Sequence, residues 1–437
     1  MIAAQLYHNR HLAIRLPIAI GALALMAYMW LGLFPIAPAQ IRFSAGGPNG
    51  AYTQDARRYA QVLAPWGVEV QVLTSAGTPE NLQRLQDGAA DVAFAQGGFG
   101  YLDTSFTPRS IDGIATMANV GIEHLWLFAH SRGIDSVAQL RTLRVGVAGP
   151  GSGSRSLLEK LMELWRLQPK DYNLVTLSDA QMPAALASGQ VDAVAQVASA
   201  NAPLVQRLLA IPDIQLVHLA RSAAIYERLP YLEPYLVLRG SLSEQRTQPE
   251  QDTTLLTTHT SLVANQALHP ALQRLVAHAA QQVHARTHGT HRSSEFPSLK
   301  QLDFPSSAQA RRVLEAGLPW WEASLPYWWA QVLVRLLLIC LPIALVAWLL
   351  CRALPAVLYW QLQSQLNRWY GELKFIEGDL AKDQVVGIDV ARYVSRLAGI
   401  DREMTRFRTP PSLLQRWYSL RQHVDFVRLG LVKLRGR

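Results

Sequence analysis

Two long apolar segments flank a central region of mixed polarity. Leu16 to Phe34 contains no charged residue, and neither does Leu336 to Cys351. About 20 apolar residues are enough to cross a bilayer, so both segments predict transmembrane helices. Ala37-Pro38-Ala39 has the small-x-small form of a signal-peptide cleavage site. We interpret the first segment as an uncleaved anchor because its apolar run is longer than the usual signal-peptide core, with a cleaved signal as the alternative.

Between these segments, short apolar runs alternate with amphipathic helical patterns and glycine-rich loops. The alternation starts at Ile41, and it starts again after Ala129. Strand, loop and helix repeated in this way predict an α/β fold with a mostly parallel sheet in two similar lobes. Strands are predicted over 41–43, 68–73, 91–95, 125–129, 143–148, 174–177, 191–195 and 253–263, and helices over 51–64, 78–86, 155–165, 182–188, 268–283 and 308–317.

The loop Gly149–Ser154 stands out within this pattern. It follows the strand ending at Ala148 and leads into the helix that starts at Arg155. Such a loop directs free backbone N–H groups and small hydroxyls toward one point at the positive end of the helix dipole, where an anion binds well. A βα turn that binds nothing is the alternative.

Ligands of parallel α/β sheets bind outside the carboxyl ends of the strands. We expect Thr78 to cap a helix there, with Pro79 in its first position. Gln96 follows one strand directly, and Gln196 follows another, so the two are expected at equivalent positions of the two lobes. Ser44, Gly46 and Gly47 belong to the same predicted edge.

Charge is concentrated at the two ends of the chain. The whole sequence has 41 Lys and Arg against 32 Asp and Glu, and residues 352–437 account for 15 of the basic and 8 of the acidic residues. Basic flanks beside apolar spans predict that both termini are cytoplasmic and that residues 41 to about 325 lie outside. No nucleic-acid partner is needed to explain them. Cys340 and Cys351 both belong to the second apolar segment, so no disulfide is expected in the outer domain.

Motifs for catalysis are absent from the sequence. There is no Gly-x-Ser-x-Gly elbow and no Walker A loop, so we predict that the protein is not an enzyme and needs no cofactor. His278, His284, His288 and His291 form a histidine cluster. No further ligands with metal-site spacing accompany it, so a solvated helix end is preferred and no metal site is predicted.

Several segments together resemble the TAXI-type solute receptors of TRAP transporters, over residues 41 to about 285. They are Gly46-Gly47 with Tyr52, the run 77–82, the strand 90–96, the loop 151–154 and the run 187–193. The resemblance implies the two-lobed periplasmic binding protein fold of type II, with lobe 1 formed by 41–128 and 225–318 and lobe 2 by 129–224. Residues 1–40 and 319–352 are assigned to the transmembrane parts, and 353–437 to an α-helical cytoplasmic tail.

The resemblance also implies a function. A receptor of this kind captures a small organic anion, such as an amino acid or another carboxylate, and passes it to a TRAP-type permease. Here it would be anchored in the bacterial inner membrane with its main domain in the periplasm; a membrane-bound ligand sensor or scaffold is the alternative. Arg155 is predicted to bring positive charge to the ligand, with a solvent-facing arginine as the alternative. The implied ligand-binding residues are Ser44, Gly47, Tyr52, Thr78, Asn81, Gln96, Ser152, Ser154 and Gln196.

Overall fold

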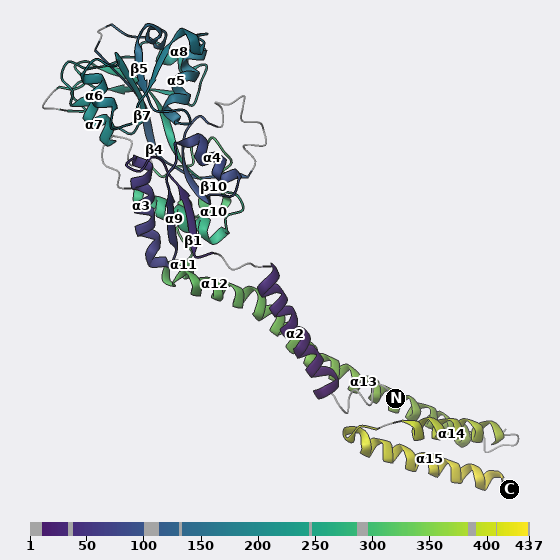
Figure 1. The fold of residues 1–437 in the computed structure, drawn as a ribbon. Coiled ribbons are helices and arrows are strands. Elements are labelled where there is room, and N and C mark those ends of the chain that lie inside the picture. The colour runs from purple at the N-terminus through teal and green to yellow at the C-terminus, as the bar shows by residue number, and fades with distance from the viewer. Residues whose placement is uncertain are drawn as a thin grey trace. The chain divides into compact units, whose positions relative to one another are not determined.

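The computed structural model describes most of the chain and divides it into two units (Figure 1). One unit is Ala37–Gln331, and the other combines Met1–Ile36 with Val332–Arg437. The described residues are 11–33, 38–99, 113–130, 133–243, 247–285, 296–382, 390–407 and 409–435.

Lobe 1 of the first unit is built on parallel strands β1 (Gln40–Ser44), β2 (Glu69–Leu73) and β3 (Val92–Gln96). The rings of Phe43, Tyr59 and Phe94 meet in its core, where every one of these side chains is fully buried. Apolar residues at helical spacing bring helices onto this sheet. These are α3 (Ala51–Leu63), α4 (Thr78–Gln86), α9 (Pro270–His284) and α10 (Ala308–Ala316).

Lobe 2 repeats the arrangement with parallel strands β5 (Arg144–Val147), β6 (Asn173–Thr176) and β7 (Ala193–Ala198). Its helices cover two apolar cores, one with Leu157 and Leu161 and the other with Met182 and Leu186. The main helices are α5 (Gly153–Leu164), α6 (Met182–Ala187) and α7 (Pro203–Leu209), and the smaller elements are α8 (Ser222–Tyr226) and β8 (Gln215–Leu216).

Two long strands, β4 (Ile114–Ala129) and β10 (Thr253–Asn265), run antiparallel through the middle of the unit and join the lobes into one sheet. Its order is β2-β1-β3-β10-β4-β7-β5-β6, with β8 beside β4 and β9 (Glu233–Val237) beside β10. The predicted two-lobed α/β architecture is therefore confirmed. The sequence predicted only the second part of β4, because almost all of this strand is buried on both faces and shows no alternation.

Each lobe contains an arginine–aspartate pair at the same place in its sheet, and these two pairs show which residues of the lobes correspond. In lobe 1 the backbone N–H and guanidinium of Arg42 bind Asp91, with N···O distances of 2.7 to 3.1 Å. In lobe 2 Arg144 binds Asp192 through the same atoms, at 2.8 to 3.1 Å. Counting from these aspartates, Gln96 corresponds to Val197. The predicted equivalence of Gln96 and Gln196 is thus wrong by one residue, because β7 continues to Ala198 and holds Gln196 inside the strand.

The start of α4 also differs from the prediction. Gly77, with φ at 146°, occupies the N-cap position, and Thr78 is the first helical residue. The Thr78 hydroxyl accepts the backbone N–H of Gln96 at 2.9 Å instead of capping its own helix. This contact ties the start of α4 to the end of β3.

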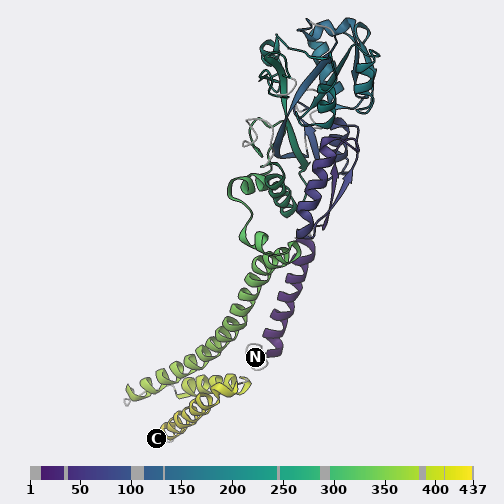
Figure 2. The ribbon, with the colours of Figure 1, turned by 90° about the vertical axis from the view of Figure 1, so that its left-hand side faces the viewer.

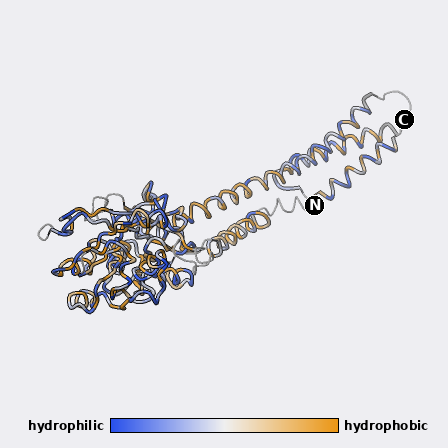
Figure 3. Tube along the Cα trace, turned by 90° about the horizontal axis from the view of Figure 1, so that it is seen from above, coloured by the Kyte–Doolittle hydropathy of each residue, from blue (hydrophilic) through white to orange (hydrophobic). Residues whose placement is uncertain are grey.

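The second unit is helical. Among the described residues, two segments are long and apolar enough to cross a membrane, Leu12–Gly32 and Tyr327–Asp379, and Figure 3 shows the apolar stretches of both. The first contains α2 (Leu16–Tyr28), and the second contains α12 (Tyr327–Arg335) and nearly all of α13 (Leu341–Lys382), which is one long helix in Figure 2. The C-terminal part of α13 packs with α14 (Val390–Arg406) and α15 (Leu414–Arg435) around a separate apolar core. The predicted helical tail is confirmed; Phe34 and Ala37 lie outside the described residues.

Candidate functional site

A cavity of about 680 Å³ lies between the two lobes, at the carboxyl ends of their parallel strands. The glycine loop after β1 and the start of α4 line it from lobe 1, and the loop before α5 lines it from lobe 2. Seven of the predicted site residues are in its wall: Gly47, Tyr52, Thr78, Gln96, Ser152, Ser154 and Gln196. Ser44, Asn81 and Arg155 do not line it.

Three hydroxyl groups in the wall share one arrangement. Each oxygen already accepts a backbone N–H: Thr78 Oγ1 from Gln96 at 2.9 Å, Ser152 Oγ from Arg155 at 3.2 Å, and Ser154 Oγ from Val197 at 2.9 Å. A hydroxyl that uses its oxygen in this way still has its proton to donate. Thr78, Ser152 and Ser154 therefore present O–H donors to whatever occupies the cavity.

Two glutamines add amide groups to the same wall. Gln96 is 4% exposed, and its Nε2 has no hydrogen-bond partner among the described residues. The Oε1 atom of Gln196 is also buried without a partner there, while its Nε2 donates to the carbonyl of Val197. Leaving a buried polar group unpaired costs about 1 to 3 kcal/mol, so these atoms favour a ligand that completes their hydrogen bonds.

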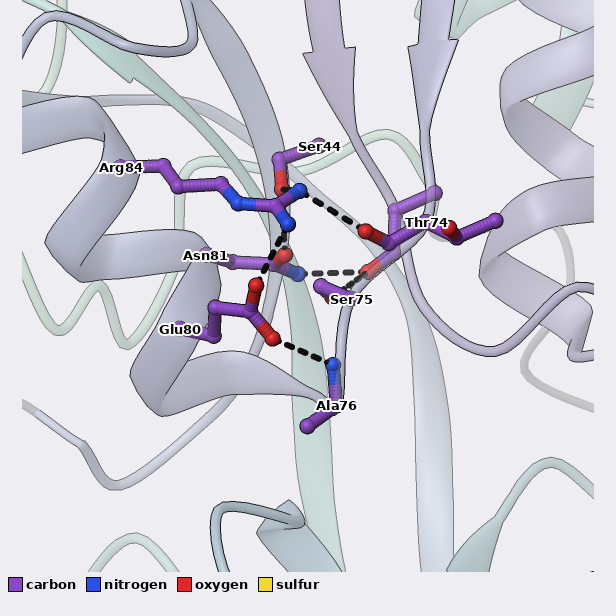
Figure 4. Close-up of polar contacts among 8 residues, drawn as sticks. Ser44, Thr74, Ser75, Ala76, Glu80, Asn81 and Arg84 are labelled. Carbon is purple, nitrogen blue, oxygen red and sulfur yellow. Dashed lines mark hydrogen bonds and ion pairs between the residues drawn. The ribbon is translucent and has the colours of Figure 1, made fainter.

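Ser44 and Asn81 lie behind the cavity wall in a polar cluster (Figure 4). Ser44 Oγ donates to Asn81 Oδ1 at 2.7 Å, and Asn81 Nδ2 donates to the carbonyls of Ala45 and Phe94 at 2.6 and 2.8 Å. Arg84 donates to the carbonyl of Thr74 at 2.8 Å. The cluster joins the ends of β1 and β3 to α4 and so positions the loop that precedes Thr78.

Arg155 is held away from the cavity. Its Nε pairs with Glu159 Oε1 at 2.8 Å, and its Nη1 donates to Thr176 Oγ1 at 3.1 Å. The side chain is 20% exposed, so it is only partly open to solvent. The reason is the i,i+4 spacing, which places Glu159 directly beside it on α5.

The lobes touch where their loops meet. A Cβ atom on Gly77 of lobe 1 would lie 3.1 Å from the carbonyl oxygen of Gly151 and 3.2 Å from Cα of Ser152. A Cβ on Gly153 would lie 2.2 Å from Oε1 of Gln96. Glycine is thus required on both sides of the junction for this close approach.

Sequence reasoning missed the charged residues of the wall, Glu123, Asp179 and Arg207. Glu123, on β4, accepts a hydrogen bond from Tyr52 Oη at 3.0 Å. Burial raises the pKa of Glu123 to about 8, against the hydrogen bonds from Tyr52 and Thr260. Burial also raises the pKa of Asp179, which the nearby Arg207 partly offsets. No local signal identifies Glu123, because its strand pairing brings it to the cavity from the part of β4 that the sequence did not reveal.

Of the histidine cluster, His284 is buried in lobe 1 beside the rings of Tyr59 and Phe94, and burial lowers its pKa to about 4. His288 and His291 lie outside the described residues. Within the described ranges, the structure brings together no group of three metal-ligating side chains.

The sequence also matches a family of known proteins. The model of the NMT1-like family matches residues 47–302, which include most of both lobes and nearly all of the residues that line the cavity. The chain belongs to the NMT1-like family. The membership agrees with the periplasmic binding protein fold that the sequence predicted.

The chain is also similar to proteins of solved structure, although their sequence identity to it is low. A protein of Bordetella bronchiseptica RB50 is 17% identical over 64% of this chain and 90% of its own, with a TM-score of 0.42. The periplasmic aliphatic sulphonate binding protein of Escherichia coli is 16% identical over 65% of this chain and 84% of its own, with a TM-score of 0.35. An amino acid ABC transporter substrate-binding protein of Streptococcus pneumoniae, bound to L-arginine, is 16% identical over 56% and 89%, with a TM-score of 0.34. No curated protein sequence matches the chain.

Proposed function

We propose that this member of the NMT1-like family is a membrane-anchored extracytoplasmic receptor that captures a small organic anion between its two lobes for a TRAP-type permease. The observation that carries the proposal is the cavity itself, whose wall combines Thr78, Ser152 and Ser154 as O–H donors with Gln96, whose Nε2 has no partner among the described residues. A wall rich in donors complements a ligand rich in acceptors, such as a carboxylate. A ligand that contacts both lobes stabilises their closed arrangement only, so binding and closure are linked.

The ligand can be identified and the site tested with the same protein. Native mass spectrometry of the full chain in detergent identifies the small molecule that co-purifies, and calorimetry then measures its affinity. The double variant Ser152→Ala/Ser154→Ala should lose about tenfold or more per hydroxyl, since hydrogen bonds to charged groups contribute about 1.5 to 3 kcal/mol each.

The matched control is Ser156→Ala. Ser156 lies on the same helix, but its Oγ donates to the carbonyl of Ser152 and it does not line the cavity. The two hydroxyls that the double variant removes also accept hydrogen bonds from backbone N–H groups, so the thermal unfolding of the variant is compared with that of wild type. Wild-type affinity in a folded double variant would remove the loop before α5 from the site.

The membrane part of the proposal places both termini in the cytoplasm and the lobes outside. Two helices suited to span a membrane and the basic flanks support it. With Cys340 and Cys351 replaced by serine, a cysteine at exposed Glu250 should react with an impermeant reagent in intact spheroplasts, and one at exposed Ser419 only after lysis. The reverse pattern would contradict the topology. Co-purification of a TRAP-type permease tests the partner.

One observation favours a second function, a membrane-bound sensor or scaffold. Residues of α13, α14 and α15 share an apolar core of their own, including Leu366, Trp369 and Leu420. A packed helical tail of this kind is larger than an anchor requires. A cytoplasmic signalling protein in place of a permease among the co-purifying partners would favour this function.

A further inference from the structure

Glu123 in the cavity wall is a buried acid that lacks an opposite charge. Glu123 is only 7% exposed to solvent. The carboxyl group accepts a hydrogen bond from Tyr52 Oη at 3.0 Å, and a second side-chain hydrogen bond comes from Thr260 on β10. None of the ion pairs in the described ranges includes Glu123. The Tyr52 hydroxyl is thus oriented toward the carboxyl group, while no ion pair of the described chain compensates for its burial.

Burial is the main reason that the acid is neutral, and the charges around it do not offset that burial. On α3, Asp55 is a second acid, and it pairs with Arg58 at 3.0 Å rather than with Glu123. Asp179 and Arg207 belong to the wall of lobe 2, where Arg207 Nη2 lies 3.4 Å from the carbonyl of Asp179. Burial and Asp55 both raise the pKa of Glu123, to about 8. At neutral pH the carboxyl therefore holds its proton until a positive group arrives.

We propose that Glu123 is the subsite for an ammonium group of the ligand, and that its carboxyl releases one proton to solvent when that group binds. The proton leaves the Glu123 oxygen, the ligand ammonium keeps its own protons, and an ion pair forms between carboxylate and ammonium. This inference rests on the proposed function and narrows its ligand to a zwitterion. The ammonium meets Glu123 and Tyr52, and the ligand carboxylate meets the hydroxyls of Ser152 and Ser154 in the opposite lobe.

Matched pairs of small carboxylates test the inference on the full chain in detergent. The pairs are L-glutamate with glutarate, L-alanine with propanoate, and L-leucine with 4-methylpentanoate, which differ only in the amino group. We expect one or more of the amino acids to bind at least tenfold tighter than its amine-free counterpart. Calorimetry at pH 7 in two buffers of different ionisation enthalpy should report the release of close to one proton per ligand bound.

Two variants separate the role of Glu123 from a general effect of acidic residues. Glutamine has the shape of the neutral acid, so Glu123→Gln keeps the fold and removes only the ability to ionise. This variant should bind the amino acid no more tightly than its amine-free counterpart, and it should release no proton on binding. Its affinity for the amino acid should be about tenfold to a hundredfold lower than that of wild type. Asp55→Asn removes a half-buried acid that does not line the cavity, and it should keep both properties because burial, and not Asp55, is the main cause of the raised pKa of Glu123.

The possible failures are distinguishable. If the amine-free member of a pair binds as tightly as the amino acid, or if Glu123→Gln still releases the proton, the ammonium subsite is wrong and the proposed solute-binding function stands. If no member of any pair binds, the small-carboxylate ligand of the proposed function is contradicted together with this inference.

Discussion

The two lobes share one scaffold and differ in the chemistry that they bring to the cavity. Each has a parallel sheet fixed by an arginine–aspartate pair, Arg42 with Asp91 in lobe 1 and Arg144 with Asp192 in lobe 2. Beside lobe 1, the wall contains the buried acid Glu123. Lobe 2 contributes the start of α5, with its hydroxyls and the positive end of the helix dipole. A repeated fold can thus give a cleft two unlike walls, which favours a ligand with two unlike ends.

The lobes also hold their second loop and helix differently. In lobe 1 a polar cluster around Asn81 fixes α4 against β1 and β3. In lobe 2 the corresponding helix α6 packs through the apolar side chains of Met182 and Leu186. Hydrogen bonds constrain direction as well as distance, so lobe 1 fixes Gly77 and Thr78 more closely than apolar contacts would.

The largest expected effect concerns the acid beside lobe 1. The pKa of Glu123 is about 8 in the folded protein, above its ordinary value of 4.5, so the folded state binds this proton more tightly than the unfolded state. The stability from this group is complete below pH 4.5 and is lost as the pH rises to 8. Without ligand, the free energy of unfolding of Glu123→Gln, measured relative to wild type, should therefore increase by on the order of 4 kcal/mol between pH 4.5 and pH 8.

Chemical denaturation of both proteins across this pH range measures the difference. Asp179→Asn is the comparison in lobe 2. Because Arg207 partly offsets the raised pKa of Asp179, the free energy of unfolding of this variant, relative to wild type, should increase less with pH. A constant difference between Glu123→Gln and wild type would show that Glu123 is ionised in the folded protein.

The polar cluster of lobe 1 should make a single amide costly to remove. Asn81→Ala deletes two buried hydrogen bonds to backbone carbonyls, and we expect the free energy of unfolding to fall by about 2 to 4 kcal/mol. Gln83→Ala, at an exposed position of the same helix, should change it by less than about 1 kcal/mol. Equal losses for the two variants would mean that the cluster does not fix α4.

A single added Cβ atom at the junction of the lobes should hinder their closure. Gly77→Ala places a Cβ against the backbone of Gly151 and Ser152, at a φ of 146° that other residues rarely adopt. The lobes must then separate, so affinity for the co-purified ligand should fall about tenfold. Gly88→Ala, also at positive φ but with nothing within 4 Å, should destabilise the fold modestly and keep the affinity. An affinity loss in Gly88→Ala alone would contradict the lobe contact.

The extent to which the sequence predicted this arrangement follows from how local each signal is. The loop before α5 and the start of α4 were found because glycine, serine and proline at fixed spacings act within a few residues. Glu123 escaped because strand pairing with β10, far away in the sequence, brings it to the cavity. Ser44 and Asn81 have the residue types of a binding site, but only the tertiary structure shows that each is already paired with the other.

The central claim is that the cavity is a ligand site, and Gln96 tests it most directly. Its Nε2 is buried and has no partner among the described residues, so Gln96→Leu removes a group whose burial costs stability without ligand. We would measure thermal unfolding of wild type, Gln96→Leu and the lobe 2 variant Gln196→Leu, each with and without the co-purified ligand. The account predicts that Gln96→Leu keeps or raises the melting temperature without ligand, and that it loses most of the ligand-induced rise seen in wild type. A lower melting temperature without ligand, together with an undiminished ligand-induced rise, would contradict it.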